Sequence, residues 1–418
     1  MTDTGSARVV DDEPGVLTGI RVVELATWAF VPAAGVVLAD WGAEVVKIER
    51  PGTGDPIRGL VASGMLPTAS HSTNFMLETT SRGKRGIALD LSTPDGRDVL
   101  LRLVETADVF LTNYLPGVRC KLGIDVEDLR GVNPRLIYVR GSGLGPRGPE
   151  ADAGGYDGAT FWARAGVGQV TSPPGGGLPL PLPGPGYGDV QAGAHLAGGV
   201  AAALLDRERT GRARVVDVSL LAAGLWTMGP HVSAADLHGT GEIAAPVHET
   251  APNPLSASYV TGDGRAVVLV MLESDRFWGP LTEALGRPEL ATDPRFADAA
   301  SRMAHSRACV AELDATFGAM TIEEAAQRLS RQRGVWARFT SPGEASHDRQ
   351  AEVNGYVADL ATADGGTLRV VTAPAQFDET APRPVRAPGH GEHTDALLAE
   401  LGVGPDEVRR LRRPGRSG

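Results

Sequence analysis

Asp189 is the residue whose type and setting most directly suggest chemistry. It ends a stretch, residues 173–189, in which proline and glycine predominate, and an apolar segment rich in small residues follows at once. We expect a loop that delivers the carboxylate to the first position of a buried helix, because Asp is a favoured N-cap and a helix N-terminus favours an anion. Gly186 and Gly188 lack a Cβ, so a ligand could approach the backbone closely there. An ionised, partly desolvated and reachable carboxylate suits a nucleophile; a helix cap without chemistry is the alternative.

The elements that must position this aspartate alternate between strand and helix. Helices are expected near residues 32–41, 94–106, 126–132 and 190–209. Short apolar runs separated by such helices imply crossover connections and a mostly parallel sheet, so the fold class is α/β. Ligands on such sheets bind beyond the carboxyl ends of the strands. Strands are predicted at residues 20–25, 43–49, 86–90, 108–112, 136–140 and 214–221.

Composition shifts divide the chain into five parts. The acidic N-terminus is expected to be a flexible tail, and the segment with three histidines and no clear period is expected to be a linker and active-site wall. A hairpin with an Asp-Gly turn, followed by helices, predicts a smaller α+β domain. The parts are a tail at 1–16, a large domain at 17–221, the linker at 222–253, the small domain at 254–335, and a return of the chain to the large domain at 336–418.

The overall composition excludes several classes of function. The chain has 418 residues and a formal net charge of −11, which disfavours nucleic acid and anionic membranes as partners. No apolar run is long enough for a membrane span, and no signal-peptide pattern is present. Cys120 and Cys309 lie far apart without metal-ligand spacing, which favours a cytoplasmic location and no metal site. No G-x-G-x-x-G follows the first strand, so an NAD site is not expected.

A set of segments in fixed order resembles the class III CoA-transferase family, also called CaiB–BaiF. Its relatives include formyl-CoA transferase, carnitine CoA-transferase and α-methylacyl-CoA racemase. The resemblance extends from about Leu17 to about Leu401. The segments are G-A-E-V-V-K-I-E-R-P-G-T-G-D at 42–55 with Arg58, R-G-K-R-G-I-A-L-D-L at 82–91, residues 107–123, residues 133–149, G-Y-D at 155–157, G-D at 188–189 and A-P-G-H-G-E-H-T-D at 387–395.

This resemblance implies a fold and an assembly. The large domain would be Rossmann-like, built from both ends of the chain around a mostly parallel sheet, with the small domain inserted between them. Two chains would form a homodimer by threading through each other as linked rings. The composition shifts agree with this domain layout but carry no information about the rings.

The resemblance also implies roles for individual residues. Asp189 would be the nucleophile, no cofactor would be tightly bound, and a CoA thioester and an acceptor carboxylic acid would be the substrates. A concentration of basic residues (Arg50, Arg82, Lys84, Arg85, Arg119 and Lys121) could bind the three phosphates of CoA, or could be a solvated surface. The residues expected to contact CoA are Thr27, Trp28 and Ala29 at the adenine end, and Arg50, Leu89, Asn113, Tyr114, Lys121 and Leu122 along the nucleotide and pantetheine.

Three functions stay open from the sequence. The first is CoA transfer between carboxylates through mixed anhydrides and an aspartyl-CoA thioester. The second is racemisation of a 2-methylacyl-CoA, for which Glu273 matches an expected acid–base residue but could equally be a helix-cap neighbour. Tyr156 replaces the histidine of the racemases, and a phenol with an ordinary pKa of about 10 is a poor base at neutral pH. The third is a CoA-binding protein without turnover.

Overall fold

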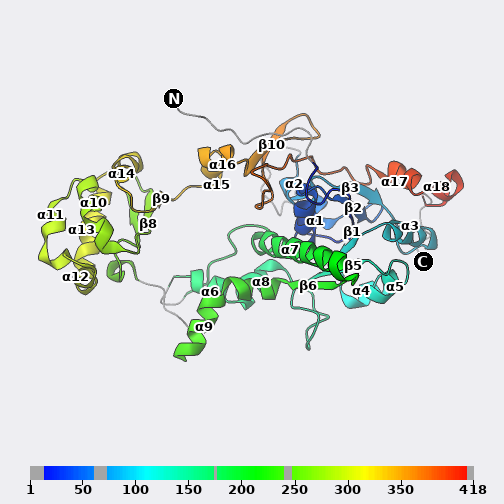
Figure 1. Ribbon diagram of the computed structural model, residues 1–418, viewed down its shortest axis with the longest axis horizontal. Coiled ribbons are helices and arrows are strands. Elements are labelled where there is room, and N and C mark those ends of the chain that lie inside the picture. The colour runs from blue at the N-terminus through cyan, green and yellow to red at the C-terminus, as the bar shows by residue number, and fades with distance from the viewer. Residues whose placement is uncertain (1–13, 61–72, 174–176, 240–246, 412–418) are drawn as a thin grey trace. The chain divides into compact units, whose positions relative to one another are not determined.

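The computed structural model describes residues 14–60, 73–173, 177–239 and 247–411 (Figure 1). The chain forms two compact units, one of residues Met1–Ile243 with Asp348–Gly418 and the other of Ala244–His347. Each unit is described by itself below. Most of the predicted tail, residues 1–13, lies outside the described residues.

A parallel sheet forms the centre of the larger unit. Within the described residues it has six strands in the order β3-β2-β1-β4-β5-β6, and every neighbouring pair is parallel. The strand order reverses between β1 and β4, which creates a crevice at the carboxyl ends of these two strands. The six predicted strands are confirmed. They are β1 (Arg21–Leu25), β2 (Glu44–Glu49), β3 (Arg85–Ala88), β4 (Val109–Thr112), β5 (Ile137–Ser142) and β6 (Val215–Ser219).

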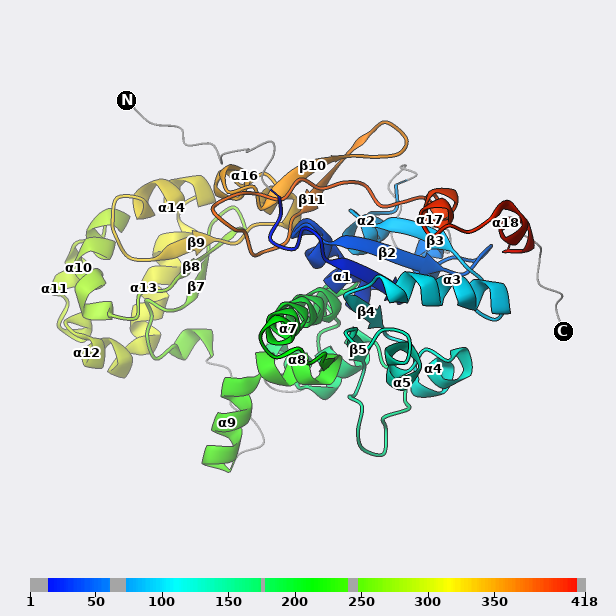
Figure 2. The same cartoon turned by 45° about the vertical axis from the view of Figure 1, so that its right-hand side comes forward.

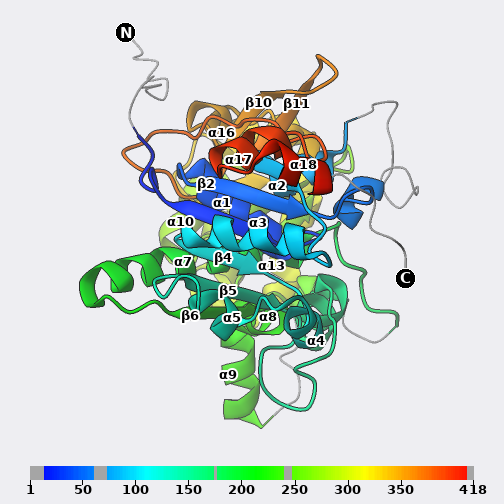
Figure 3. The same cartoon turned by 90° about the vertical axis from the view of Figure 1, so that its right-hand side faces the viewer.

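Helices cover both faces of this sheet, because successive strand residues point to opposite faces. Val22 and Val45 pack with α1, α7 and α8 on one face, whereas Val23 and Val46 pack with α3, α5 and α17 on the other. Figure 3 shows α3 and α17 on the near side of the sheet. The helices of this unit are α1 (Phe30–Asp40), α2 (Phe75–Ser81), α3 (Pro94–Glu105), α4 (Pro116–Leu122), α5 (Val126–Arg130), α6 (Val167–Thr171), α7 (Tyr187–Thr210), α8 (Leu220–Thr227), α9 (Gly229–His238), α16 (Arg349–Val353), α17 (Thr394–Glu400) and α18 (Pro405–Leu411), with a π-helix at Gly158–Arg164.

Both ends of the chain belong to the larger unit, but only its N-terminal part builds the parallel sheet that the structure describes. Within the described residues, the C-terminal part adds no strand to the parallel sheet. Residues of this part instead bond along the edge strand β3: the His393 N–H donates to the Gly86 carbonyl at 2.9 Å, and the Ala88 N–H donates to Thr394 Oγ1 at 3.1 Å. Earlier in this part, β11 (Thr367–Val371) pairs with β10 (Val357–Ala361) in a separate antiparallel hairpin (Figure 2). A partner a few residues away costs less loop-closure entropy than a distant one.

The segment after residue 221, which is expected to be a linker and active-site wall, is helical over much of its described length. Ser219 caps α8 by accepting a hydrogen bond from the Ala222 N–H at 3.0 Å, and α9 follows directly. None of the residues of α9 is buried. An apolar period arises only where a helix buries one face, so the sequence of α9 carries no such signal.

The smaller unit is an α+β fold around its own core. Its antiparallel sheet has the order β7-β8-β9, and the predicted Asp-Gly hairpin joins β7 to β8. Leu269, Leu281, Leu313 and Phe317 are fully buried in its core. Its elements are β7 (Ser258–Val260), β8 (Ala266–Leu269), α10 (Ser274–Leu285), α11 (Glu289–Thr292), α12 (Ala299–Ala304), α13 (Ser306–Gly318), α14 (Ile322–Leu329), β9 (Trp336–Arg338) and α15 (Pro342–Ala345). Across the described part of both units, no helix is long and apolar enough to cross a bilayer.

Candidate active site

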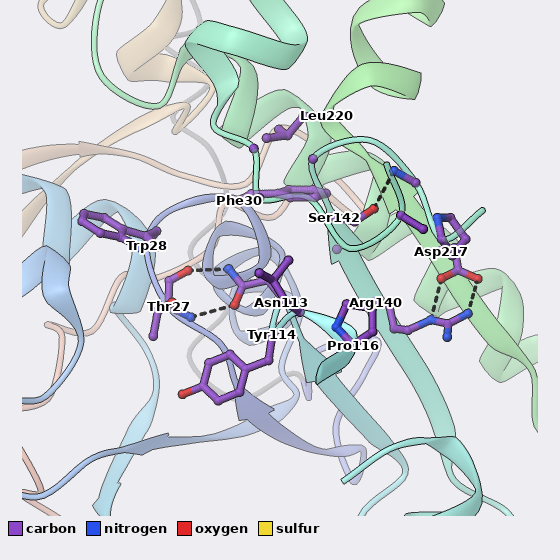
Figure 4. A pocket seen from close by; sticks show the side chains of 18 of the residues that line it. Thr27, Trp28, Phe30, Asn113, Tyr114, Pro116, Arg140, Ser142, Asp217 and Leu220 are labelled. Carbon is purple, nitrogen blue, oxygen red and sulfur yellow. Dashed lines mark hydrogen bonds and ion pairs between the residues drawn. The ribbon is translucent and has the colours of Figure 1, made fainter. Parts of the chain in front are cut away.

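A pocket of about 420 Å³ lies at the carboxyl edge of the parallel sheet (Figure 4). Residues at or just beyond the ends of β1, β4, β5 and β6 line it, so it occupies the crevice where the strand order reverses. Five of the predicted CoA or substrate contacts line it together with Asp189: Thr27, Trp28, Asn113, Tyr114 and Tyr156. All of these residues belong to the larger unit.

Asp189 reaches this pocket from the first turn of α7. The N-cap of the helix is Gly186, whose φ of 74° lies in the left-handed region that favours glycine, so Asp189 is the third residue of the helix and not its cap. Gly188 serves packing, because a Cβ at this position would lie 2.5 Å from Cγ of Phe161. The helix therefore begins three residues, about one turn, before its predicted start at residue 190, whereas the placement of the carboxylate near a helix N-terminus is kept.

The pKa of Asp189 is higher than the ionised carboxylate expected from the sequence would have. Burial and the neighbouring charge of Asp157 raise the pKa of Asp189 to about 7. Asp157 accepts hydrogen bonds from the Gly158 N–H at 2.8 Å and from the Gly188 N–H at 3.3 Å, which places its charge beside the first turn of α7. Within the described residues, no cation pairs with the Asp189 carboxylate. The group is therefore partly protonated at neutral pH and basic enough to react as it ionises.

Asn113 holds the turn after β1 against the end of β4. Its side-chain oxygen accepts from the Thr27 N–H at 3.0 Å and its amide donates to the Thr27 carbonyl at 2.6 Å (Figure 4). These two bonds use both ends of the amide, as a strand partner would. Asn113 thus acts on this turn as a positioning residue.

Trp28 is held in a strained backbone conformation at the pocket. Its φ is 67°, a region that a bulky residue adopts at a cost of about 1–3 kcal/mol. Its N–H donates to Oδ1 of the buried Asp55 at 3.0 Å, and the other oxygen of Asp55 lies 2.9 Å from Nζ of Lys47. The Trp28 ring meets the Tyr156 ring edge to face, with centroids 5.7 Å apart. Strain held by a buried ion pair beside a pocket indicates a functional constraint.

Two arginines line the pocket, and both make bonds within the protein. Arg140 forms a two-point ion pair with Asp217, at 2.7 and 3.0 Å (Figure 4). Arg119 donates to the Tyr114 carbonyl at 2.8 Å and lies 3.4 Å from the Asp125 carboxylate. Among the described residues that line the pocket, Asp189 is then the charged group without a partner of opposite sign.

The other predicted contacts do not line this pocket. Ala29 is buried in a small cluster with Ile57 and Met76, and Leu89 is buried in the core of the large unit. Leu122 is partly buried beside the same core, whereas Arg50 and Lys121 are exposed. Glu273 belongs to the smaller unit, where its side chain is exposed and lies 3.1 Å from Arg276.

The predicted concentration of basic residues is largely internal. Arg82 pairs with Asp40 at 2.6 Å, and Arg85 pairs with Glu44 and Glu400, each at 2.6 Å. Lys84 is buried against Glu24 at 2.6 Å. Together with Arg119, these side chains stabilise the fold, because a buried cation requires a partner. Only Arg50 and Lys121 of the predicted set keep exposed side chains for phosphate binding.

Three carboxylates that shape the site are absent from the sequence-based prediction. Asp55 holds Trp28, Asp157 raises the pKa of Asp189, and Asp217 neutralises Arg140. Asp55 and Asp157 stand in the quoted motifs, each before a short helical segment, a pattern typical of a cap. Asp217 lies within a predicted strand, and no local pattern indicates its partner.

Comparisons with known proteins agree with this geometry. A family described as CoA-transferase family III matches residues 17–394. Cinnamoyl-CoA:phenyllactate CoA-transferase of Clostridium sporogenes is 30% identical over 405 residues, which cover 96% of this chain and 97% of that protein. Succinate–glutarate CoA-transferase of Agrobacterium fabrum is 31% identical over 395 residues, covering 92% and 95%. A solved CaiB/BaiF family protein from Brucella suis has a TM-score of 0.80 at 27% identity and covers 93% of this chain and 100% of that chain. The chain therefore belongs to CoA-transferase family III, the CaiB/BaiF family, and is a class III CoA-transferase.

Proposed function

We propose that the protein transfers CoA from an acyl-CoA to an acceptor carboxylic acid through a covalent intermediate at Asp189. The observation that carries this proposal is the partnerless carboxylate of Asp189 in the pocket at the strand-order reversal. A carboxylate used only for stability is normally paired when it is buried. One left without a cation keeps its basicity for attack on a carbonyl carbon.

The chemistry proceeds by exchange of acyl groups. The Asp189 carboxylate attacks the thioester carbonyl, the C–S bond breaks, and a mixed anhydride and CoA thiolate form. The thiolate then attacks the Asp189 acyl carbon, which releases the first acid and leaves an aspartyl-CoA thioester. The acceptor carboxylate attacks this thioester and releases the thiolate. Attack of the thiolate on the acceptor carbon of the second anhydride gives the new acyl-CoA and restores Asp189.

CoA would lie across the crevice between β1 and β4. Thr27 and Tyr114 line the pocket there, and Asn113 holds Thr27 in place. The exposed Arg50 and Lys121 are the cations that we assign to the phosphates. Ala29, Leu89 and Leu122 would then support this surface from below and not contact CoA through their side chains.

A racemase would share the fold but not the chemistry, and no observation in the structure favours it. An isotope experiment separates the two. With a 2-methylacyl-CoA in D₂O, a transferase leaves the α-proton in place but exchanges labelled free acid into the thioester. Rapid deuteration of the α-carbon without exchange of the acid would instead assign a racemase that uses Asp189 and Glu273. CoA binding with neither reaction would assign a protein without turnover.

We also propose that the protein is a homodimer. The resemblance to the family suggests this assembly, and exposed apolar side chains on α8 and α9 support it. Trp226 and Leu237 are 76% and 79% exposed, an unusual state for large apolar residues on neighbouring helices. Light scattering at micromolar concentration would give twice the chain mass, whereas a monomer mass would refute the dimer.

A further inference from the structure

The walls of the pocket around Asp189 are mainly apolar. They come from the turn after β1, the start of α4 and the start of α8. An apolar wall gains free energy by covering apolar ligand surface, and a charged ligand group gains nothing from it. The apolar lining side chains are Trp28, Phe30, Leu115, Pro116, Val118 and Leu220.

The charged side chains of the pocket also favour an uncharged ligand group, because both arginines are already paired. Arg140 is engaged by Asp217 through two bonds, and Arg119 bonds Tyr114 and Asp125. A second carboxylate on a substrate would have to displace Asp217 or remain unpaired beside Asp189. An unpaired charge in such a site is strongly disfavoured. An acid whose far end is uncharged avoids this cost.

Trp28 is held in place by contacts of both its backbone and its ring. Its left-handed backbone is held by Asp55, and its ring lies against Tyr156. The turn that carries it lies next to the start of α7, because a Cβ on Gly186 would be 3.8 Å from Cβ of Ala29. The Trp28 and Tyr156 rings therefore form a preset aromatic wall in the pocket that Asp189 enters.

From these contacts we infer that the transferred acid is a monocarboxylic acid with an apolar, preferably aromatic or branched, side chain, and that Trp28 determines this preference. The inference rests on the proposed transfer at Asp189 and adds the class of substrate. An aromatic substrate side chain would pack on the Trp28 or Tyr156 ring in an offset or edge-to-face arrangement.

The test uses an exchange reaction that requires no knowledge of the natural acid pair. Each acyl-CoA is incubated with the full-length enzyme and the isotopically labelled form of its own free acid, and label entering the thioester is measured. The panel compares hexanoate with adipate, which adds a terminal carboxylate, and includes phenylpropanoate. We expect kcat/KM for hexanoate and phenylpropanoate to exceed that for adipate at least about tenfold. Equal or faster exchange of adipate would overturn the substrate class.

Variants assign the cause of the preference. Trp28→Gly removes the ring and relaxes the strained backbone, and should lower the phenylpropanoate-to-adipate ratio of kcat/KM about tenfold. Trp28→Phe keeps an aromatic ring and should retain most of the ratio. Asp217→Asn frees Arg140 and should raise the adipate-to-hexanoate ratio about three- to tenfold. Asp206→Asn, which breaks an ion pair with Arg214 outside the pocket, is the matched control.

The outcomes separate this inference from the function beneath it. If no acid of the panel exchanges its label and no covalent adduct forms at Asp189, the transfer reaction itself is refuted. If exchange occurs but the ratios of kcat/KM between acids are unchanged in Trp28→Gly and Asp217→Asn, the inference is refuted and the transfer reaction is not.

Discussion

Two groups of buried charge lie near the carboxyl end of β1, and they are treated in opposite ways. In the first, Lys47 and Lys84 share Glu24 at 3.0 and 2.6 Å, and Lys47 also meets Asp55 at 2.9 Å. In the second, Asp189 stands beside Asp157 with no cation among the described residues. Charges in the first group are matched and stabilise the fold, whereas the second group leaves a carboxylate unpaired, as the proposed nucleophile requires.

The pKa directions express this difference. Burial alone would lower the pKa of Lys47, but Glu24 and Asp55 raise it above its ordinary value. Burial lowers the pKa of Lys84 to about 8, because Glu24 offsets that cost only in part. Asp189 has burial and Asp157 acting in the same direction, and its pKa rises to about 7. A pKa near the working pH suits a group that must gain and lose reactivity there.

The largest expected effect is the loss of activity when the unpaired carboxylate of Asp189 is removed. Asp189→Ala should lower acid exchange at least about 1,000-fold, because no other group can form the aspartyl thioester. CoA affinity should stay within about tenfold, since binding contacts lie elsewhere along the crevice. Exchange kinetics and calorimetric titration with CoA measure both. More than a few per cent of residual exchange would place the nucleophile elsewhere.

Removing a charge from the paired group of Lys47, Glu24 and Asp55 should lower the stability of the fold. Lys47→Met leaves Glu24 and Asp55 short of a buried partner and should lower the free energy of unfolding by about 3–5 kcal/mol. Lys121→Met, at an exposed lysine, is the control and should change it by less than about 0.5 kcal/mol. Urea unfolding followed by circular dichroism checks both. Equal stability of the two variants would show that this network contributes little.

A smaller effect should appear in the pH dependence. Since the pKa of Asp189 is about 7, kcat/KM should rise about tenfold from pH 6 to pH 8 and then level off. Stability should change in the opposite direction to the rate. Because the pKa of this carboxyl is raised in the folded state, the free energy of unfolding should fall as the pH rises from about 4 to about 7, and Asp189→Ala should remove this fall. A flat rate profile from pH 5 to pH 8 would contradict the raised pKa.

The smallest expected effect is a shift of that profile. Asp157→Asn removes a neighbouring negative charge while keeping a side-chain oxygen for the Gly188 N–H. The midpoint of the rate profile should move to lower pH by up to about one unit, because burial, the larger cause, remains. A midpoint that stays in place would mean that the Asp157 charge does not act on Asp189.

Much of the fold was predictable because its signals are local. The parallel strands are short runs rich in valine, isoleucine and leucine, and the helices between them bury one face. The C-terminal hairpin and α9 were not, since β10 and β11 bury one residue each and α9 buries none. The placement of Asp189 near a helix N-terminus was predictable from the glycine-rich segment before it. The roles of Asp55 and Asp217 depend on contacts across 27 and 77 residues of sequence, which no motif records.

The intermediate at Asp189 is tested most directly by trapping it. Enzyme incubated with an acyl-CoA in the absence of acceptor should hold CoA as a thioester of Asp189. Sodium borohydride reduces such a thioester to an alcohol, so peptide mass spectrometry should find homoserine in place of Asp189 after treatment. In Asp189→Ala, no residue should be reduced. An unmodified Asp189 in wild-type enzyme that exchanges acid at full rate would contradict covalent transfer through this residue.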